Sequence, residues 1–153
     1  MKQILLVIAV LALTGCPANR KPESKPSPPP AADKSNKTSP PKHTADSLEL
    51  IQDRIANNEA ILIDVREKFE WEDGHLQPAV FLPLSELEEG ESDESFAAKL
   101  AKILPKDKIV YCHCVSGGRV MPASAILQKL GYDARPLKAG YRDLLNAGFT
   151  KAP

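Results

Sequence analysis

The sequence predicts an α/β domain in which a parallel sheet is covered by helices on both faces. Two observations carry this prediction. Short, β-branched apolar runs of strand length alternate along the chain with segments whose apolar residues recur at helical spacing. Proline or glycine stands at the end of most of these segments, where it stops a helix or a strand. Strands that alternate with helices form βα units, and such units build a parallel sheet.

The first helix is expected to begin at Asp46, because Glu49 three residues later completes a capping-box pattern. One face of this helix carries three apolar residues, Leu48, Ile51 and Ile55. The first strand is expected over residues 61–65, a nearly continuous apolar run. Such a run suits a strand that is buried on both faces of a sheet.

A short helix is expected over residues 67–72, and a weaker strand over 79–82 ends before Pro83. The next helix ends at Pro105, and its apolar face consists of Phe96, Leu100, Ile103 and Leu104. Six acidic residues crowd the segment 86–94. Because the segment lacks the fixed alternation and the turn glycine of a calcium loop, we interpret it as a solvated loop between helices.

The C-terminal third repeats the strand–helix pattern. A third strand is expected over 108–112 and a helix over 120–130, followed by a strand over 134–137 and a last helix over 141–147. Gly131 and Gly148 end the two helices. The folded domain is therefore expected to span residues 46–153.

Composition separates this domain from the residues before it. Eight of the 14 prolines of the 153-residue chain fall between residues 17 and 46, so residues 16–45 are expected to be a disordered Pro/Lys/Ser-rich linker. The formal net charge is zero, but residues 46–153 hold thirteen basic and eighteen acidic side chains, a net charge of −5. A mildly acidic domain has no basic surface for a phosphate backbone, so we expect no nucleic-acid partner.

The N-terminus has the pattern of an export signal. Lys2 precedes a ten-residue apolar run, Ile4 to Leu13, which is too short to span a bilayer. The residues Leu13-Thr14-Gly15-Cys16 resemble the lipobox of bacterial lipoproteins, which implies a signal peptide over 1–15 and lipid on Cys16. The expectation is a domain anchored by lipid to a bacterial membrane, facing the periplasm or the cell exterior. The alternative is an ordinary secretory signal with an incidental cysteine.

The segment with the clearest chemistry is the loop Cys114-Val115-Ser116-Gly117-Gly118-Arg119, between the third strand and the helix after it. Glycines allow the tight curvature with which successive backbone N–H groups can face a sulfur atom. These groups, the helix dipole and the Arg119 guanidinium are expected to favour the thiolate of Cys114, the nucleophilic form. They would equally stabilise the outer sulfur of a persulfide.

Four segments resemble the rhodanese family in the family's order: Asp64-Val65-Arg66, Gly74-His75-Leu76, Cys114 to Arg119, and the tail from Leu130 to Tyr132 and from Leu137 to Tyr141. The resemblance covers nearly all of residues 46–153. It implies a single rhodanese-like domain with a central, mainly parallel five-stranded sheet. It also implies transfer of sulfane sulfur through a persulfide on Cys114, without a cofactor. Asp64 and Arg66 are expected to support the loop through charge-assisted hydrogen bonds.

Loop length favours Cys114 over Cys112 as the nucleophile. Four residues separate Cys114 from Arg119, which is the length of the family's sulfur-transferring loops; related phosphatases have one residue more. Cys112 is expected to end the strand as a small buried residue. We expect no metal site, because two cysteines separated by one residue, with no second cluster, do not suffice for tetrahedral zinc.

Three functions remain open at this stage. The first is a membrane-anchored, extracytoplasmic sulfurtransferase, whose partners would be a small sulfane-sulfur donor and a thiol or protein acceptor. The second is a rhodanese-like binding module without catalysis; the presence of both Cys114 and Arg119 speaks against it. The third is a thiol redox protein in which Cys112 resolves an oxidised Cys114.

Overall fold

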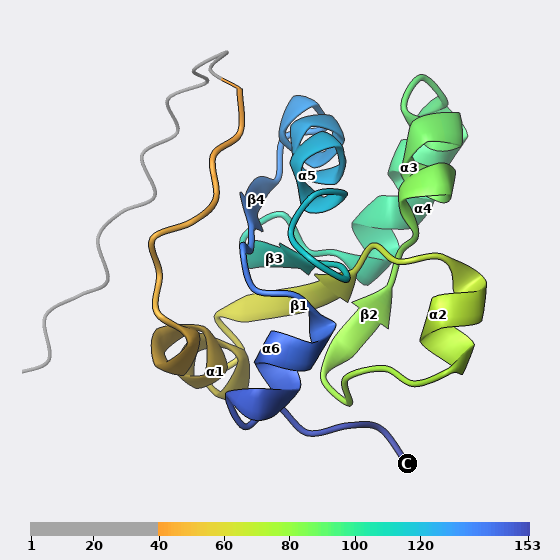
Figure 1. Ribbon diagram of the computed structural model, residues 1–153. Helices are drawn as coiled ribbons and strands as arrows, with labels where there is room; N and C mark the ends of the chain where they lie inside the picture. The colour runs from red at the N-terminus through yellow and green to blue at the C-terminus, as the bar shows by residue number, and fades with distance from the viewer. Residues whose placement is uncertain (1–39) are drawn as a thin grey trace, which may run out of the picture. The chain divides into compact units, whose positions relative to one another are not determined.

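The computed structural model describes residues 40–153, shown in colour in Figure 1. The predicted signal peptide, the predicted lipidation site Cys16 and most of the predicted linker lie outside these residues. The elements follow in the order α1 (Leu48–Ala56), β1 (Ala60–Asp64), α2 (Lys68–Glu72), β2 (Ala79–Phe81), α3 (Leu84–Gly90), α4 (Glu94–Ile103), β3 (Ile109–His113), α5 (Val120–Lys129), β4 (Asp133–Pro136) and α6 (Tyr141–Asn146). In the described part of the chain, no helix has the length and apolar character needed to cross a membrane.

The sheet has four parallel strands in the order β2-β1-β3-β4. The fold class and the four strands expected from the apolar runs are confirmed, but the five-stranded sheet implied by the family resemblance is wrong. Before α1, Thr44 donates one backbone hydrogen bond to the carbonyl of Pro136 on β4. Pro40 and Pro41 precede it and have no N–H to donate, so this segment does not extend into a fifth strand.

Side chains of the strands alternate between two hydrophobic cores, one on each face of the sheet. Figure 1 shows the helices that cover each face. The helices α3, α4 and α5 cover the face to which Val110, Cys112 and Cys114 belong. The helices α1 and α6 cover the other face, where Tyr111 and Leu62 are buried. Because residues two apart share a face, Cys112 and Cys114 both point toward α5.

The acidic segment is helical, so its interpretation as a solvated loop is wrong. α3 spans Leu84–Gly90 and α4 begins at Glu94, after Asp93, whose carboxylate accepts the N–H of Ser95. Within α3, Leu87 is fully buried in the core beside α5, and Leu84 packs against that core. The acidic side chains lie on the remaining faces of the helix. Two leucines at helical spacing decide the structure here, and the number of charges does not.

The start of α1 also differs from the prediction. Ser47 caps the helix and accepts the N–H of Leu50, whereas Asp46 makes long-range contacts. The Asp46 Oδ2 atom accepts hydrogen bonds from Tyr111 at 2.6 Å, Arg54 at 2.8 Å and Arg135 at 2.9 Å. Burial alone would raise the pKa of Asp46, but the hydrogen bonds from Tyr111 and Arg135 outweigh it and lower the pKa to about 2. Asp46 therefore ties the segment before α1 to β3 and β4.

Asp46→Asn is expected to lower the free energy of unfolding by about 1–2 kcal/mol at pH 7. The carboxylate contributes stability above its unfolded pKa, and this contribution is lost as the pH falls through the folded pKa of about 2. The difference between Asp46→Asn and the parent protein should therefore shrink between pH 4 and pH 2. Urea unfolding at several pH values measures it, and a difference that stays constant with pH would contradict the assignment.

Candidate active site

The loop between β3 and α5 begins where β3 ends, at the carboxyl edge of the sheet (Figure 1). Crevices outside this edge are the usual ligand sites of parallel α/β sheets. Cys114 follows the last residue of β3, and Arg119 caps α5. The structure therefore brings the two predicted catalytic residues to the two ends of one tight loop.

The Cys114 thiol lies at the floor of this loop, with only 1% of the residue exposed. The backbone N–H of Gly117 donates to its Sγ atom at 3.2 Å. Gly117 adopts φ +81°, a left-handed conformation that glycine takes without strain. The N–H of Gly118 has no acceptor among residues 40–153, so it remains free for an anion bound in the loop. Val115 and Ser116 are exposed at the rim.

Residues 138–141, which follow β4, support the loop. The N–H of Tyr141 donates to the carbonyl of Cys114 at 2.8 Å. A Cβ atom on Gly140 would lie 1.7 Å from the carbonyl oxygen of Val115, so the backbone of the loop rests directly on this glycine. Gly117 is packed in the same way against the carbonyl of Lys138. The loop conformation is thus fixed by backbone packing against residues 138–141.

The segment before α1 reaches the loop as well. The Nε2 atom of His43, an exposed residue, donates to the carbonyl of Gly117 at 2.9 Å. His43 and Thr44 belong to the predicted linker, yet both make hydrogen bonds with the domain. Neither residue carries a motif from which these contacts could be predicted.

Arg119 pairs with Glu70 of α2. Its Nη1 atom donates to Glu70 Oε2 at 2.5 Å and its Nη2 atom to Oε1 at 2.8 Å, a bidentate contact. The same Oε2 accepts the N–H of Glu67 and so caps α2. The hydrogen bonds from Arg119 lower the pKa of Glu70, which keeps this carboxyl ionised. The predicted anion-binding arginine thus has a carboxylate partner that its sequence position did not reveal.

Asp64 and Arg66 form a buried pair beside the loop. Arg66 donates to both carboxylate oxygens of Asp64, with the shortest contact at 2.6 Å, and also to the carbonyl of Gly74. The guanidinium lies 4.2 Å from the centre of the Tyr141 ring, on the segment that supports the loop. Asp64 is also paired in register with His113, whose neighbour is Cys114. The two residues therefore support the surroundings of the loop and do not line its rim.

His113 and Cys112 precede Cys114 in the chain and are fully buried on opposite faces of the sheet. Burial lowers the pKa of His113 to about 4, so its ring is neutral at pH 7. Burial raises the pKa of Cys112 to about 12, and its thiol accepts a hydrogen bond from Ser124 at 3.3 Å. A thiol with so high a pKa is protonated at neutral pH and is a poor nucleophile. Both cysteines are free thiols.

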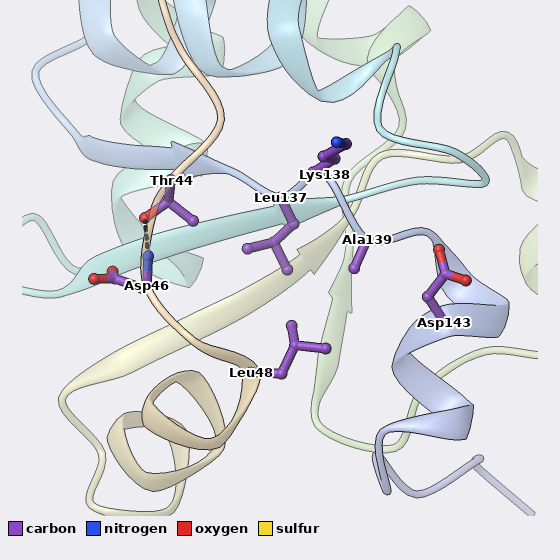
Figure 2. Close-up of a pocket in the computed structure, with 7 residues that line it drawn as sticks. All are labelled: Thr44, Asp46, Leu48, Leu137, Lys138, Ala139 and Asp143. Atoms are coloured by element: carbon purple, nitrogen blue, oxygen red, sulfur yellow. Dashed lines mark hydrogen bonds between the residues drawn. The ribbon is translucent and has the colours of Figure 1, made fainter.

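A cavity of about 420 Å³ lies next to the supporting segment and is shown in Figure 2. It opens between the segment before α1, the chain leaving β4 and the start of α6; its lining residues are Thr44, Asp46, Leu48, Leu137, Lys138, Ala139 and Asp143. The loop from Cys114 to Arg119 is not part of this lining. We place the candidate site in the loop and not in this cavity, because the loop holds the predicted nucleophile, Cys114.

The arrangement can hold a negatively charged sulfur. Hydrogen bonds from N–H groups to an anionic atom are strong where water is excluded, and the Cys114 thiol is nearly inaccessible. A reactant must reach it with a slim terminal atom, past the exposed Val115 and Ser116. Within the described residues, no group of three or more His, Cys, Asp or Glu side chains is arranged to hold a metal ion.

Comparison with known proteins identifies the family of the domain. The family model for the rhodanese-like domain matches residues 47–147. Among solved structures, the human single-domain sulfurtransferase TSTD1 is 28% identical, with a TM-score of 0.56; the match covers 71% of this chain and 96% of that one. A rhodanese-related protein from Thermoplasma volcanium is 25% identical, with a TM-score of 0.53, and the match covers 69% of this chain and 93% of that one.

A curated relative gives a higher identity over a shorter stretch. A Schizosaccharomyces pombe protein, named as a candidate mitochondrial thiosulfate sulfurtransferase, is 41% identical over 76 residues. These residues are 47% of this chain and 53% of that protein, so the chain spans about half the length of this relative.

Proposed function

The chain belongs to the rhodanese-like domain family, and from this membership we propose that it is a sulfurtransferase that carries sulfane sulfur as a persulfide on Cys114. The donor is a small molecule with a sulfane sulfur atom, and the acceptor is a thiol, free or on a protein. No cofactor is needed, because the transferred atom is bound covalently at every stage.

The observation that carries the proposal is the position of the Cys114 Sγ atom, which accepts the N–H of Gly117 and lies in the same loop as the free N–H of Gly118. The thiolate attacks the outer sulfur of the donor, the donor's S–S bond breaks, and the leaving group takes the electron pair. The product is a persulfide anion on Cys114. An acceptor thiolate then attacks the outer sulfur and leaves with it, and the Cys114 thiolate is restored.

Mass spectrometry of the protein after incubation with a sulfane-sulfur donor tests this function. The expected result is the gain of one sulfur atom on Cys114, lost again when an acceptor thiol is added. A disulfide between Cys112 and Cys114 would instead support the thiol redox function. No change with any donor would support a binding module.

We also propose that the domain is anchored to a bacterial membrane by lipid on Cys16, on the side facing the periplasm or the cell exterior. The support is the Leu-Thr-Gly-Cys motif, residues 13–16, directly after a short apolar run. A signal peptide over 1–15 would direct export, and residues 16–45 would link the lipid to the domain. Several acyl chains on one residue would hold the protein firmly at the bilayer.

Cys16→Ser is expected to move most of the protein from the membrane fraction to the soluble fraction of bacterial cells. The replaced thiol is the attachment point of the lipid, so nothing else in the motif can substitute for it. Fractionation followed by immunoblotting measures the change. Cys112→Ser is the control and should leave the partition unchanged. A Cys16→Ser protein that stays in the membrane would overturn the anchoring proposal.

A further inference from the structure

We infer that Glu70 is a specificity-determining residue, which selects sulfur donors of low negative charge by holding the Arg119 guanidinium. The inference rests on the proposed function and deepens it, because it assigns a substrate class to the same site. Glu70 acts through Arg119 and through its own charge, so it is a positioning residue.

The contact geometry shows that both terminal nitrogens of Arg119 already bind a carboxylate. Both Nη atoms of Arg119 donate to the two carboxylate oxygens of Glu70, at 2.5 and 2.8 Å. An incoming anion must therefore displace this carboxylate or bind beside it. Arg119 is the one basic residue in the loop 114–119, so no second cation of the loop compensates for Glu70.

Glu70 is also held in place by the helix that carries it, α2. Its Oε2 atom accepts the N–H of Glu67 at 3.0 Å, so the carboxylate is fixed at the first turn of α2. The side chains of Glu70 and Arg119 are 16% and 32% exposed, which leaves their interaction only partly screened by water. A carboxylate that pairs with Arg119 and also accepts a backbone N–H is costly to displace.

Near this pair, exposed apolar side chains accompany the polar Ser116. Val115, next to the nucleophile, is 50% exposed, and Phe69, next to Glu70, is 72% exposed. An uncharged organic group suits these apolar side chains, whereas thiosulfate brings two negative charges and no apolar group. The favoured class is therefore organic persulfides and thiosulfonates, which carry at most one negative charge beside the transferred sulfur.

Two donors that differ by one charge test the inference on the full chain. Thiosulfate, a dianion, gives its outer sulfur to the Cys114 thiolate and leaves as sulfite. Methanethiosulfonate, a monoanion, reacts in the same way and leaves as methanesulfinate. Each step breaks one S–S bond, forms one S–S bond and needs no oxidant or reductant.

Glu70→Gln removes the charge and retains an oxygen that can accept the N–H of Glu67, as in the Gln form of a capping box. The KM for thiosulfate is expected to fall about tenfold in this variant, the order given by one nearby charge in a partly hydrated site. Coulomb energy scales with the charge of the donor, so the KM for methanethiosulfonate should fall only about threefold. Removing a merely structural contact would change both values by the same factor.

Glu72→Gln is the matched control on the same helix, because Glu72 pairs with Lys68 and lies outside the site. It should change neither KM. If Glu70→Gln melts well below the parent protein, the KM ratio of the two donors in the parent protein is measured against salt concentration. The KM for thiosulfate divided by the KM for methanethiosulfonate should fall as salt screens Glu70.

Equal changes in KM for both donors, or none, would overturn the inference while sulfur transfer itself remains. A KM ratio of the two donors that does not change with salt concentration would also overturn the inference. Absence of transfer from both donors, in the parent protein and in Glu70→Gln, would overturn the proposed function and this inference together.

Discussion

Cys114→Ser is expected to abolish sulfur transfer, with a loss of roughly a thousandfold or more, because a serine hydroxyl is a weak nucleophile and cannot carry a persulfide. Cys112→Ser is expected to keep most of the activity. The Cys112 thiol is fully buried and its pKa is raised to about 12, so it is protonated at neutral pH. Ser124, which donates to the thiol, can also bond the introduced hydroxyl and limit the cost of burying it.

Single-turnover transfer from a sulfane donor to a thiol is measured on both variants, under conditions in which both are folded. It separates the role of Cys114 from that of Cys112. The expected order is full activity for the parent protein, most of it for Cys112→Ser and none for Cys114→Ser. Equal loss in the two variants would support a dithiol mechanism and contradict a simple persulfide cycle on Cys114.

Gly140→Ala is expected to destabilise the domain by about 3 kcal/mol or more and to reduce activity strongly. The added Cβ atom would lie 1.7 Å from the carbonyl oxygen of Val115, so one backbone segment must move. That movement displaces the loop in which the N–H of Gly117 donates to Cys114. Thermal unfolding measures the first effect, as a decrease in Tm of roughly 10 °C or more, and persulfide formation measures the second.

Gly118→Ala is the matched control for stability. A Cβ atom on Gly118 has no neighbour within 4 Å, and its φ is outside the left-handed region that favours glycine. The substitution should leave the Tm nearly unchanged. A Gly140→Ala variant as stable as Gly118→Ala would show that residues 138–141 do not hold the loop rigidly.

The structure also bears on the two rival functions. Cys112 is poorly suited to resolve an oxidised Cys114, because resolution needs a thiolate and burial raises the pKa of the Cys112 thiol to about 12. A binding module without chemistry needs no N–H directed at a cysteine sulfur, yet Gly117 donates to Cys114 at 3.2 Å. These two observations favour the sulfurtransferase proposal.

Local pattern was sufficient for the strands and most of the helices. The run 61–65 predicted β1, and the apolar spacing from Phe96 to Leu104 predicted α4. The pattern failed where two signals competed. In α3, the charges of residues 86–94 suggested a loop, but Leu87 is buried in a core formed with distant residues. At Asp46, a capping pattern was present, yet Arg135 and Tyr111 bind the carboxylate instead.

The sequence by itself determined the α/β class and the tight loop and predicted the nucleophile, because these depend on residues that are neighbours in the chain. Four residues between Cys114 and Arg119, two of them glycine, are sufficient to define the loop. Only the tertiary structure decided the partner of Arg119 and the support of the loop. Glu70 and Gly140 come from distant segments, and such contacts depend on how the helices and the segment after β4 pack around the carboxyl edge of the sheet, which no local spacing records.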